Sequence, residues 1–262
     1  MKPFGGFRAQ DPREIPGLTL RGWWSFWDEW QSLVTIDAGS GEDRISQLDS
    51  LYGGPTLVQP TDALRHRFWD VTRKGYILPR REPTRASYLY STDATLVALG
   101  NAPSANWTVV GVSHATGANF GVFGWENAAN GHYDRPINNS AGTLSASRYD
   151  GATASTQTIG DGNIARMSGP VIWCVFRIGT FLGNSQETWI NDVYLGELNH
   201  TELTLVNAQF RTARSSLTTA DQHFAEIVVF SGVPNPAGVS DPDKRYRMMH
   251  SLIRGMRAKW GV

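Results

Sequence analysis

The sequence predicts an all-β domain, a sandwich or barrel of antiparallel strands that ends in one C-terminal helix. Short apolar segments bounded by Gly, Asn, Pro and Ser clusters recur along the chain, which is typical of sandwiches and barrels. Aromatic residues crowd into positions 18–30, and so dense an apolar patch needs a distant segment to cover it. Helical periodicity is evident only near the C-terminus.

Six segments after the aromatic one have the composition of strands. They are Ala94–Leu99, Trp107–Val112, Asn119–Trp125, Val171–Ile178, Glu187–Leu195 and Ala225–Phe230. Within the fifth, the pair Asn191–Asp192 predicts a two-residue hairpin turn. The only cysteine, Cys174, lies in an apolar run; it cannot form an internal disulfide and is expected in the core.

The two ends of the chain are expected to pack against each other. Trp23, Trp24, Phe26, Trp27 and Trp30 form the aromatic segment. The segment Phe224–Phe230 reads as a strand that could cover them. A helix at about 241–259 would add a second apolar face, made by Tyr246, Met249, Ile253 and Trp260. Ser240 or Asp241 would cap this helix, and Pro242 suits its first turn.

The chain is expected to form one domain. Residues 1–17 contain glycine and proline without periodicity and are expected to be an extended arm, followed by a single sandwich over 18–262. The net charge is zero, so electrostatics favour neither nucleic acid nor a membrane as a partner. Neither a signal peptide nor a run of membrane-spanning length is evident, which indicates synthesis in a bacterial cytoplasm.

Segments from both ends carry a resemblance to a known family. The segment 18–30, Gln59–Pro60, Glu226–Phe230 and the final Lys259–Gly261 resemble the LamG-like, concanavalin-A-like jelly roll of bacteriophage and prophage virion proteins. The chain departs from that pattern by its extra tryptophans in the first segment.

The resemblance implies a jelly-roll sandwich of two antiparallel sheets with one C-terminal α-helix. It also implies a non-enzymatic virion protein of a tailed phage or gene-transfer-like particle: a head spike, head fibre, tail fibre or decoration subunit. Such a protein would be a homo-oligomer that assembles with other virion proteins and adheres to host surface polysaccharide. A depolymerase of the same fold and a cellular lectin-like module are the alternatives.

The segment Gly124–Pro136 is the first candidate for a binding surface. Sugar sites combine aromatic faces with amide and carboxylate groups, because pyranose rings have apolar faces and hydroxyl rims. Read as a flexible loop, this segment offers such groups for a glycan or a protein partner: Trp125, Asn127, Asn130, His132, Tyr133, Asp134 and Arg135. In the alternative interpretation, Trp125 and Tyr133 pack into the core.

A basic run is the second candidate. It contains Arg65, Arg67, Arg80 and Arg81, which could contact an acidic polysaccharide or an acidic neighbouring subunit. A solvated face is the ordinary interpretation of such a run.

Catalytic and metal sites are not expected. Glycoside hydrolysis needs two carboxylates close together, whereas Glu126 and Glu226 each stand alone on their segments. The histidines are scattered, which argues against a transition-metal site. No cofactor is therefore expected. The family resemblance leaves room for a calcium ion, with Asp150 and Asp161 as candidate ligands, although loop aspartates are usually just solvated.

Overall fold

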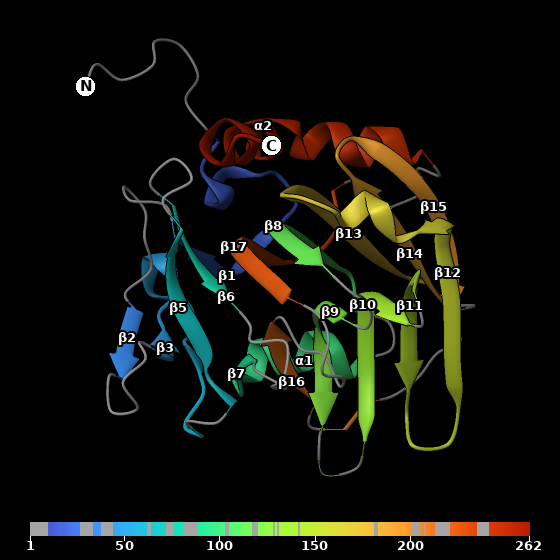
Figure 1. The fold of residues 1–262 in the computed structure, drawn as a ribbon. Coiled ribbons are helices and arrows are strands. Elements are labelled where there is room, and N and C mark those ends of the chain that lie inside the picture. Colours follow the sequence, from blue (N-terminus) through green and yellow to red (C-terminus); the bar gives the residue numbers. More distant parts are fainter. Residues whose placement is uncertain are drawn as a thin grey trace.

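The computed structural model describes residues 10–26, 34–37, 44–61, 64–71, 76–80, 88–102, 105–116, 120–127, 129, 131–140, 142–180, 183–200, 205–206, 208–212, 221–234 and 241–262. Two antiparallel sheets face each other, and a long helix lies along one side of the molecule (Figure 1). In hydrogen-bonded order, the first sheet contains β1 (Thr19–Ser25), β17 (Asp221–Ser231), β8 (Trp107–Thr116), β13 (Val171–Thr180), β14 (Gly183–Ile190) and β15 (Val193–His200).

The second sheet contains β7 (Leu89–Ser91), β16 (Gln209–Thr212), β9 (Phe120–Asn127), β10 (His132–Ser140), β11 (Thr143–Tyr149) and β12 (Ala154–Asn163). Shorter strands connect the two sheets at one edge: β2 (Val34–Asp37), β3 (Arg44–Leu48), β4 (Leu57–Val58), β5 (His66–Val71) and β6 (Tyr76–Arg80). The all-β sandwich of antiparallel strands is thereby confirmed, and the helix that ends it is α2 (Pro242–Trp260).

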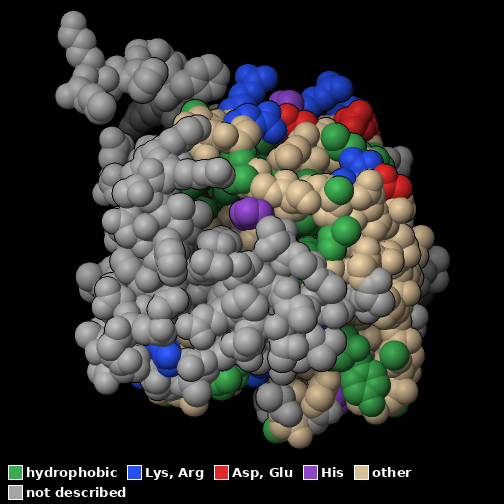
Figure 2. All heavy atoms as spheres, in the orientation of Figure 1, with side chains coloured by type: hydrophobic (Ala, Val, Ile, Leu, Met, Phe, Trp, Pro, Cys, Tyr) green, Lys and Arg blue, Asp and Glu red, His purple; other side chains and the backbone are tan. Residues whose placement is uncertain are grey.

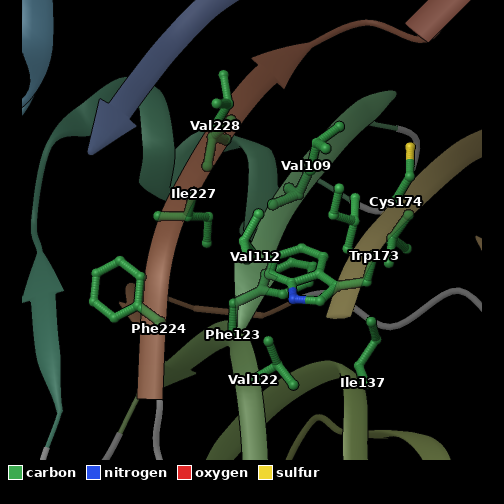
Figure 3. Close-up of a cluster of buried hydrophobic side chains, with 14 of the residues drawn as sticks. Val109, Val112, Val122, Phe123, Ile137, Trp173, Cys174, Phe224, Ile227 and Val228 are labelled. Carbon is green, nitrogen blue, oxygen red and sulfur yellow. The ribbon is translucent and has the colours of Figure 1, made fainter. Parts of the chain in front are cut away.

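Strand β13 of the first sheet is buried on both faces. In β13, all six residues of Val171–Phe176 are buried, which explains why the sequence shows a continuous apolar run there rather than alternation. Trp173 faces the second sheet and stacks on Phe123 of β9, with ring centroids 5.0 Å apart (Figure 3). Cys174 points the other way and pairs across strands with Trp189, which stacks on Tyr246 of α2.

The two ends of the chain meet, as expected. Trp23 and Trp24 of β1 pair with Val228 and Ile227 of β17. Trp24 turns inward and stacks on Phe210 of the second sheet, 5.8 Å away. Trp23 turns to the other face, where the C-terminal end of α2 lies. Trp27 and Trp30 are outside the described residues.

Helix α2 begins and ends one residue later than expected. The side chain of Asp241 accepts hydrogen bonds from the backbone N–H groups of Asp243 and Lys244, at 3.1 and 3.3 Å. Pro242 occupies the first helical position, and Gly261 ends the helix in the left-handed conformation, as glycine commonly does. Ser240, the other expected cap, is outside the described residues. No helix in the described part of the chain has the length and apolar character needed to cross a membrane.

The described part of the predicted N-terminal arm packs on the body. The short helix η1 (Pro12–Glu14) follows its cap Asp11, and both Pro12 and Ile15 are buried. The structure also contains the 3₁₀ turns η2 (Leu51–Gly53) and η4 (Ile164–Met167).

One predicted strand is wrong. Residues 94–99 belong to the helix α1 (Ala94–Asn101). The carboxylate of Asp93 accepts hydrogen bonds from the N–H groups of Thr95 and Leu96, which caps the helix. Leu96 and Leu99 are then buried one turn apart. A short apolar run fits a strand or a buried helix equally well, and here the cap decides.

The predicted two-residue hairpin turn is confirmed. Ile190 of β14 pairs with Val193 of β15, and Asn191 and Asp192 between them both have positive φ angles, 49° and 64°. Two successive positive φ values define the type I′ turn, whose twist matches that of paired strands and which Asn and Asp tolerate.

Candidate functional site

The predicted binding loop is an antiparallel hairpin, so its interpretation as a flexible loop is wrong. Residues 124–127 belong to β9 and 132–136 to β10, and the two strands pair directly. Since successive side chains of a strand point to opposite faces, the predicted residues divide between two environments. Trp125 and Asp134 are cross-strand partners on the interior face, whereas Glu126 and Tyr133 are partners on the outer face.

Trp125 is a core residue. Its ring is fully buried and lies 4.9 Å from that of Trp107 in the first sheet. Its indole N–H donates a 2.7 Å hydrogen bond to the carbonyl of Leu96 in α1. The alternative interpretation of this residue, an aromatic side chain packed into the core, therefore holds.

Asp134 is also interior, where it forms ion pairs with two arginines. Its carboxylate lies 3.1 Å from Nη1 of Arg177 and 3.3 Å from Nε of Arg148. All three side chains are 2% exposed. Gln186 accepts from Nη2 of Arg177 at 3.2 Å. Burial lowers the pKa of Arg177 to about 10, although Asp134 opposes that shift. This group holds the two sheets together from inside.

The outer face of the second sheet carries a different group of side chains. We call it the polar face and define it as Tyr88, Glu126, Tyr133, Arg135, Tyr149, Gln209 and Arg211. Cross-strand pairs place its members together: Glu126 lies opposite both Tyr133 and Gln209, and Tyr133 lies opposite Tyr149. Glu126 and Arg211 are buried, and the other five residues are half-buried.

Glu126 is the centre of the polar face. Its Oε1 accepts a 2.6 Å hydrogen bond from Nε of Arg135, and its Oε2 lies 3.3 Å from Nη1 of Arg211. Each guanidinium also lies over a tyrosine ring: Arg135 is 4.1 Å from the centroid of Tyr133, and Arg211 is 4.4 Å from that of Tyr88. Such cation–π contacts fix the plane of the guanidinium.

Partial burial changes the pKa values of the two arginines in this group. Burial lowers the pKa of Arg135 and of Arg211, because the charged form is less well solvated inside the protein. Both arginines nevertheless stay charged at neutral pH. A charge in such surroundings interacts more strongly with a ligand than one in open water.

Next to the polar face, toward β11, lies a group of buried hydroxyl and amide side chains. Nδ2 of Asn138 donates to the hydroxyl of Ser147 at 2.9 Å, and Ser145 donates to Oδ1 of Asn138 at 3.1 Å. Beyond them the rings of Tyr133 and Tyr149 lie 5.8 Å apart, and the Tyr149 hydroxyl donates to the carbonyl of Gly151. Asn138, Ser145 and Ser147 are buried and bond to one another, so they support the sheet beneath the polar face, and its half-buried tyrosines, Gln209 and Arg135 are the parts that a ligand can reach.

Asn127 and His132, from the first candidate group, lie at the end of the same hairpin. Asn127 donates from Nδ2 to the carbonyl of Val206 at 2.6 Å and accepts from the N–H of Ala129. His132 is half-buried at the start of β10. Asn130 is outside the described residues.

The basic candidates are not brought together as one patch in the described residues. Arg65 is half-buried and donates to the carbonyls of Gln59 and Pro60 at 2.8 and 2.9 Å. Arg67 and Arg80 pair across β5 and β6, but their side chains are outside the described part, as is the whole of Arg81.

The two calcium candidates have local partners. Asp150 accepts from the N–H groups of Ala152 and Thr153, and Asp161 forms a 2.9 Å ion pair with Arg166. These contacts lower the pKa of both carboxyl groups. Among the residues that the structure describes, no three His, Cys, Asp or Glu side chains gather in a way that could hold a metal ion.

Sequence reasoning missed most of the polar face. In the sequence Glu126 is an isolated carboxylate, and no local pattern marks Arg211, Gln209, Tyr88 or Tyr149 as site residues. The alternation Gln209–Phe210–Arg211 is visible in the sequence. Its position beside β9 depends on a pairing between segments more than 80 residues apart, as the contact of Arg211 with Glu126 shows.

The opposite side of the sandwich is covered by α2, and its exposed surface is mainly charged. Figure 2 shows basic and acidic side chains along the top of the molecule, where α2 runs in Figure 1. Asp243, Lys244, Arg247 and Arg254 are the exposed charged residues of this helix. These side chains surround no aromatic platform comparable to that of the polar face.

Comparison with known proteins adds evidence on the fold alone. No protein-family model and no curated protein sequence match this chain. Among solved structures, it is similar to the binding domain of Paraclostridial Mosquitocidal Protein 1, with a TM-score of 0.52 and 9% identity over 85% of this chain. The binding domain of botulinum neurotoxin DC, solved in complex with rat synaptotagmin II, gives a TM-score of 0.49 and 8% identity over 84% of this chain.

A third similar structure is the Ruminococcus gnavus IT-sialidase CBM40 bound to α2,3-sialyllactose, with a TM-score of 0.45 and 12% identity. It is matched over 96% of its length and 64% of this chain. The chain spans about half the length, 51%, of each of the two toxin binding domains. The similarity to the mosquitocidal protein agrees with the jelly-roll fold and, at 9% identity, says nothing more.

Proposed function

We propose that this protein is a carbohydrate-binding jelly-roll domain and that its polar face is the binding surface. The observation that carries the proposal is the row of half-buried tyrosines, Tyr133 and Tyr149 foremost, beside guanidinium, amide and hydroxyl groups on one sheet. Ring faces can pack on the apolar face of a pyranose, while the neighbouring donors and acceptors meet its hydroxyl rim.

The architecture favours this face over the others. Helix α2 covers the outer side of the first sheet, where Trp189 stacks on Tyr246 and Glu226 bonds to Trp260. The second sheet has no comparable helix over its outer side in the described part of the chain. Side chains on paired strands are also held more rigidly than side chains on loops, which lowers the entropic cost of binding.

The chemistry of the polar face favours binding over hydrolysis. Glycoside hydrolases act with two carboxylates, one of which donates or accepts a proton. The polar face, as defined by its described residues, contains one carboxylate, Glu126, and both of its oxygens contact arginines. A carboxylate held in this way is poorly suited to protonate a leaving group.

The biological setting within this proposal is attachment of a phage or phage-like particle to a host cell. Its support is the sequence resemblance of the two ends of the chain to virion proteins, together with the mutual packing of those ends. Genes for portal, capsid or tail proteins beside this one would support the setting. A neighbourhood of cellular sugar-metabolism genes would instead favour a lectin-like module. The native mass in solution tests whether the protein is a homo-oligomer.

The binding experiment uses the full chain and a panel of bacterial surface polysaccharides. Tyr133→Ala and Tyr149→Ala should each weaken binding about tenfold, equivalent to about 1.4 kcal/mol, with unchanged melting temperatures. Tyr194→Ala is the matched control, because Tyr194 is a partly exposed tyrosine beside α2. Equal affinities of all three variants and the unmodified protein would refute the proposal. Shortening of the polysaccharide during incubation would favour the depolymerase instead.

A further inference from the structure

Arg135 and Arg211 share one carboxylate but use it differently. Arg211 is 3% exposed, and its two terminal nitrogens contact Glu126 and Gln209, at 3.3 and 3.0 Å. Arg135 is 23% exposed and bonds to Glu126 through Nε alone. Its Nη1 and Nη2 atoms form no hydrogen bond with another described residue. As far as the described residues show, the outer end of Arg135 therefore has two donor atoms available at a partly exposed position.

The surroundings hold this free end in place. The 2.6 Å bond from Nε to Glu126 fixes one edge of the guanidinium, and the Tyr133 ring lies 4.1 Å from its central carbon. A guanidinium fixed in this way loses little entropy when it binds. Its two terminal nitrogens can donate two parallel hydrogen bonds, and a carboxylate is the group whose geometry matches this fork.

The charge balance points to the same kind of ligand. The polar face has two positive charges, Arg135 and Arg211, and one negative charge, Glu126, in its described residues. Glu126 is 3% exposed and lies between the arginines. The face therefore keeps one net positive charge in partly dehydrated surroundings, where an anionic group gains more than it would in open water.

We propose that the sugar bound by the polar face is acidic and that its carboxylate binds end-on to the terminal nitrogens of Arg135. This inference rests on the proposed carbohydrate-binding function and names the ligand class for the same surface. Arg211 is then a positioning residue, since it orients Glu126, which in turn fixes Arg135. Tyr133 and Tyr149 contact the ring of the acidic sugar or of its neighbour.

The test compares ligands that differ only in the carboxylate. One pair is a uronic-acid polysaccharide and the same polymer after reduction of its carboxylates to primary alcohols; the other is sialyllactose and lactose. Calorimetry on the full chain should show at least tenfold tighter binding of the acidic member of at least one pair. Equal affinity within both pairs would overturn the inference, and the proposed function would still stand if Tyr133→Ala weakened binding of all ligands.

Two variants assign the preference to Arg135. Arg135→Gln should bind the acidic and neutral members equally, and Arg135→Lys, which keeps the charge but loses the fork, should retain only a small preference. Arg254→Gln removes the same charge from the exposed side of α2 and should keep the full preference. A preference that survives Arg135→Gln in a folded variant would overturn the assignment. If the unmodified protein binds none of these ligands, or if Tyr133→Ala and Tyr149→Ala bind as tightly as the unmodified protein, the proposed function is refuted as well.

Discussion

The indole Nε1 of Trp23 donates a 2.7 Å hydrogen bond to Oε1 of Glu226, 203 positions later in the chain. Trp260 donates a second indole hydrogen bond, also 2.7 Å, to Oε2 of the same carboxylate. The ammonium group of Lys259 lies 2.8 Å from Oε1. One fully buried carboxylate therefore connects the first strand, the last strand and the C-terminal helix.

Replacing Glu226 with glutamine should destabilise the protein by about 3 kcal/mol. The amide nitrogen cannot accept a hydrogen bond, so one buried indole N–H loses its acceptor, and Lys259 loses its counter-charge. Urea denaturation would measure the change in the free energy of unfolding. Glu197→Gln is the control at an exposed glutamate of β15. A loss no greater than that of the control would contradict this role of Glu226.

The contact between the chain ends can be predicted from the sequence, because the N-terminal aromatic segment is apolar on both faces of its strand. Trp23 and Trp24 are adjacent, so their strand must be buried on both faces, and two separate layers must cover it. The helix face Tyr246–Met249–Ile253–Trp260 provides one of these layers. The carboxylate that joins them was not predictable, since Glu226 appears in the sequence only as one polar residue in an apolar strand.

The candidate site was less predictable for a physical reason. Residue type alone predicts Tyr133 and Arg135, but it equally predicts Trp125 and Asp134, which face the interior. Strand alternation separates the two sets only once the segment is known to be a hairpin rather than a loop. Arg211 required the pairing of β16 with β9, which is a long-range property that no local pattern encodes.

The unfolding free energy should fall as the pH rises above about 10. Burial raises the pKa of Tyr194 to about 12. Burial and the hydrogen bond to Asp192 raise that of Tyr246 as well. The unfolded chain thus loses these protons near pH 10 while the folded protein keeps them. Their contribution to stability is therefore complete below about pH 10 and is lost progressively as the pH rises toward the folded-state pKa values, about 12 for Tyr194. Urea denaturation from pH 9 to pH 11.5 would measure this, and Tyr246→Phe should flatten the curve. A variant with an unchanged slope would contradict the prediction.

Gly111 should not tolerate a methyl group while Trp173 is present. A Cβ at this position would lie 2.3 Å from the Trp173 indole and 2.9 Å from the carbonyl oxygen of Glu226. Gly111→Ala is therefore expected to cost about 1–3 kcal/mol, as overpacking of a core does. Thermal denaturation would measure it. In a Trp173→Phe background the indole is gone and the same substitution should cost less, so equal costs in both backgrounds would show that the indole is not the obstacle.

Asp134→Asn should destabilise the protein strongly without changing the ligand preference of the folded fraction. The substitution leaves the guanidinium groups of Arg148 and Arg177 buried without their counter-charge, which typically costs about 3–5 kcal/mol. Because Asp134 faces the interior, its carboxylate cannot meet a ligand at the polar face. Urea denaturation measures the loss, with Asp243→Asn on the exposed side of α2 as control. Calorimetry on the folded variant should still show tighter binding of the acidic ligand than of the neutral one. A variant that is as stable as the control but has lost this preference would contradict the interior role of Asp134. It would show that Asp134, rather than Arg135, determines the ligand preference.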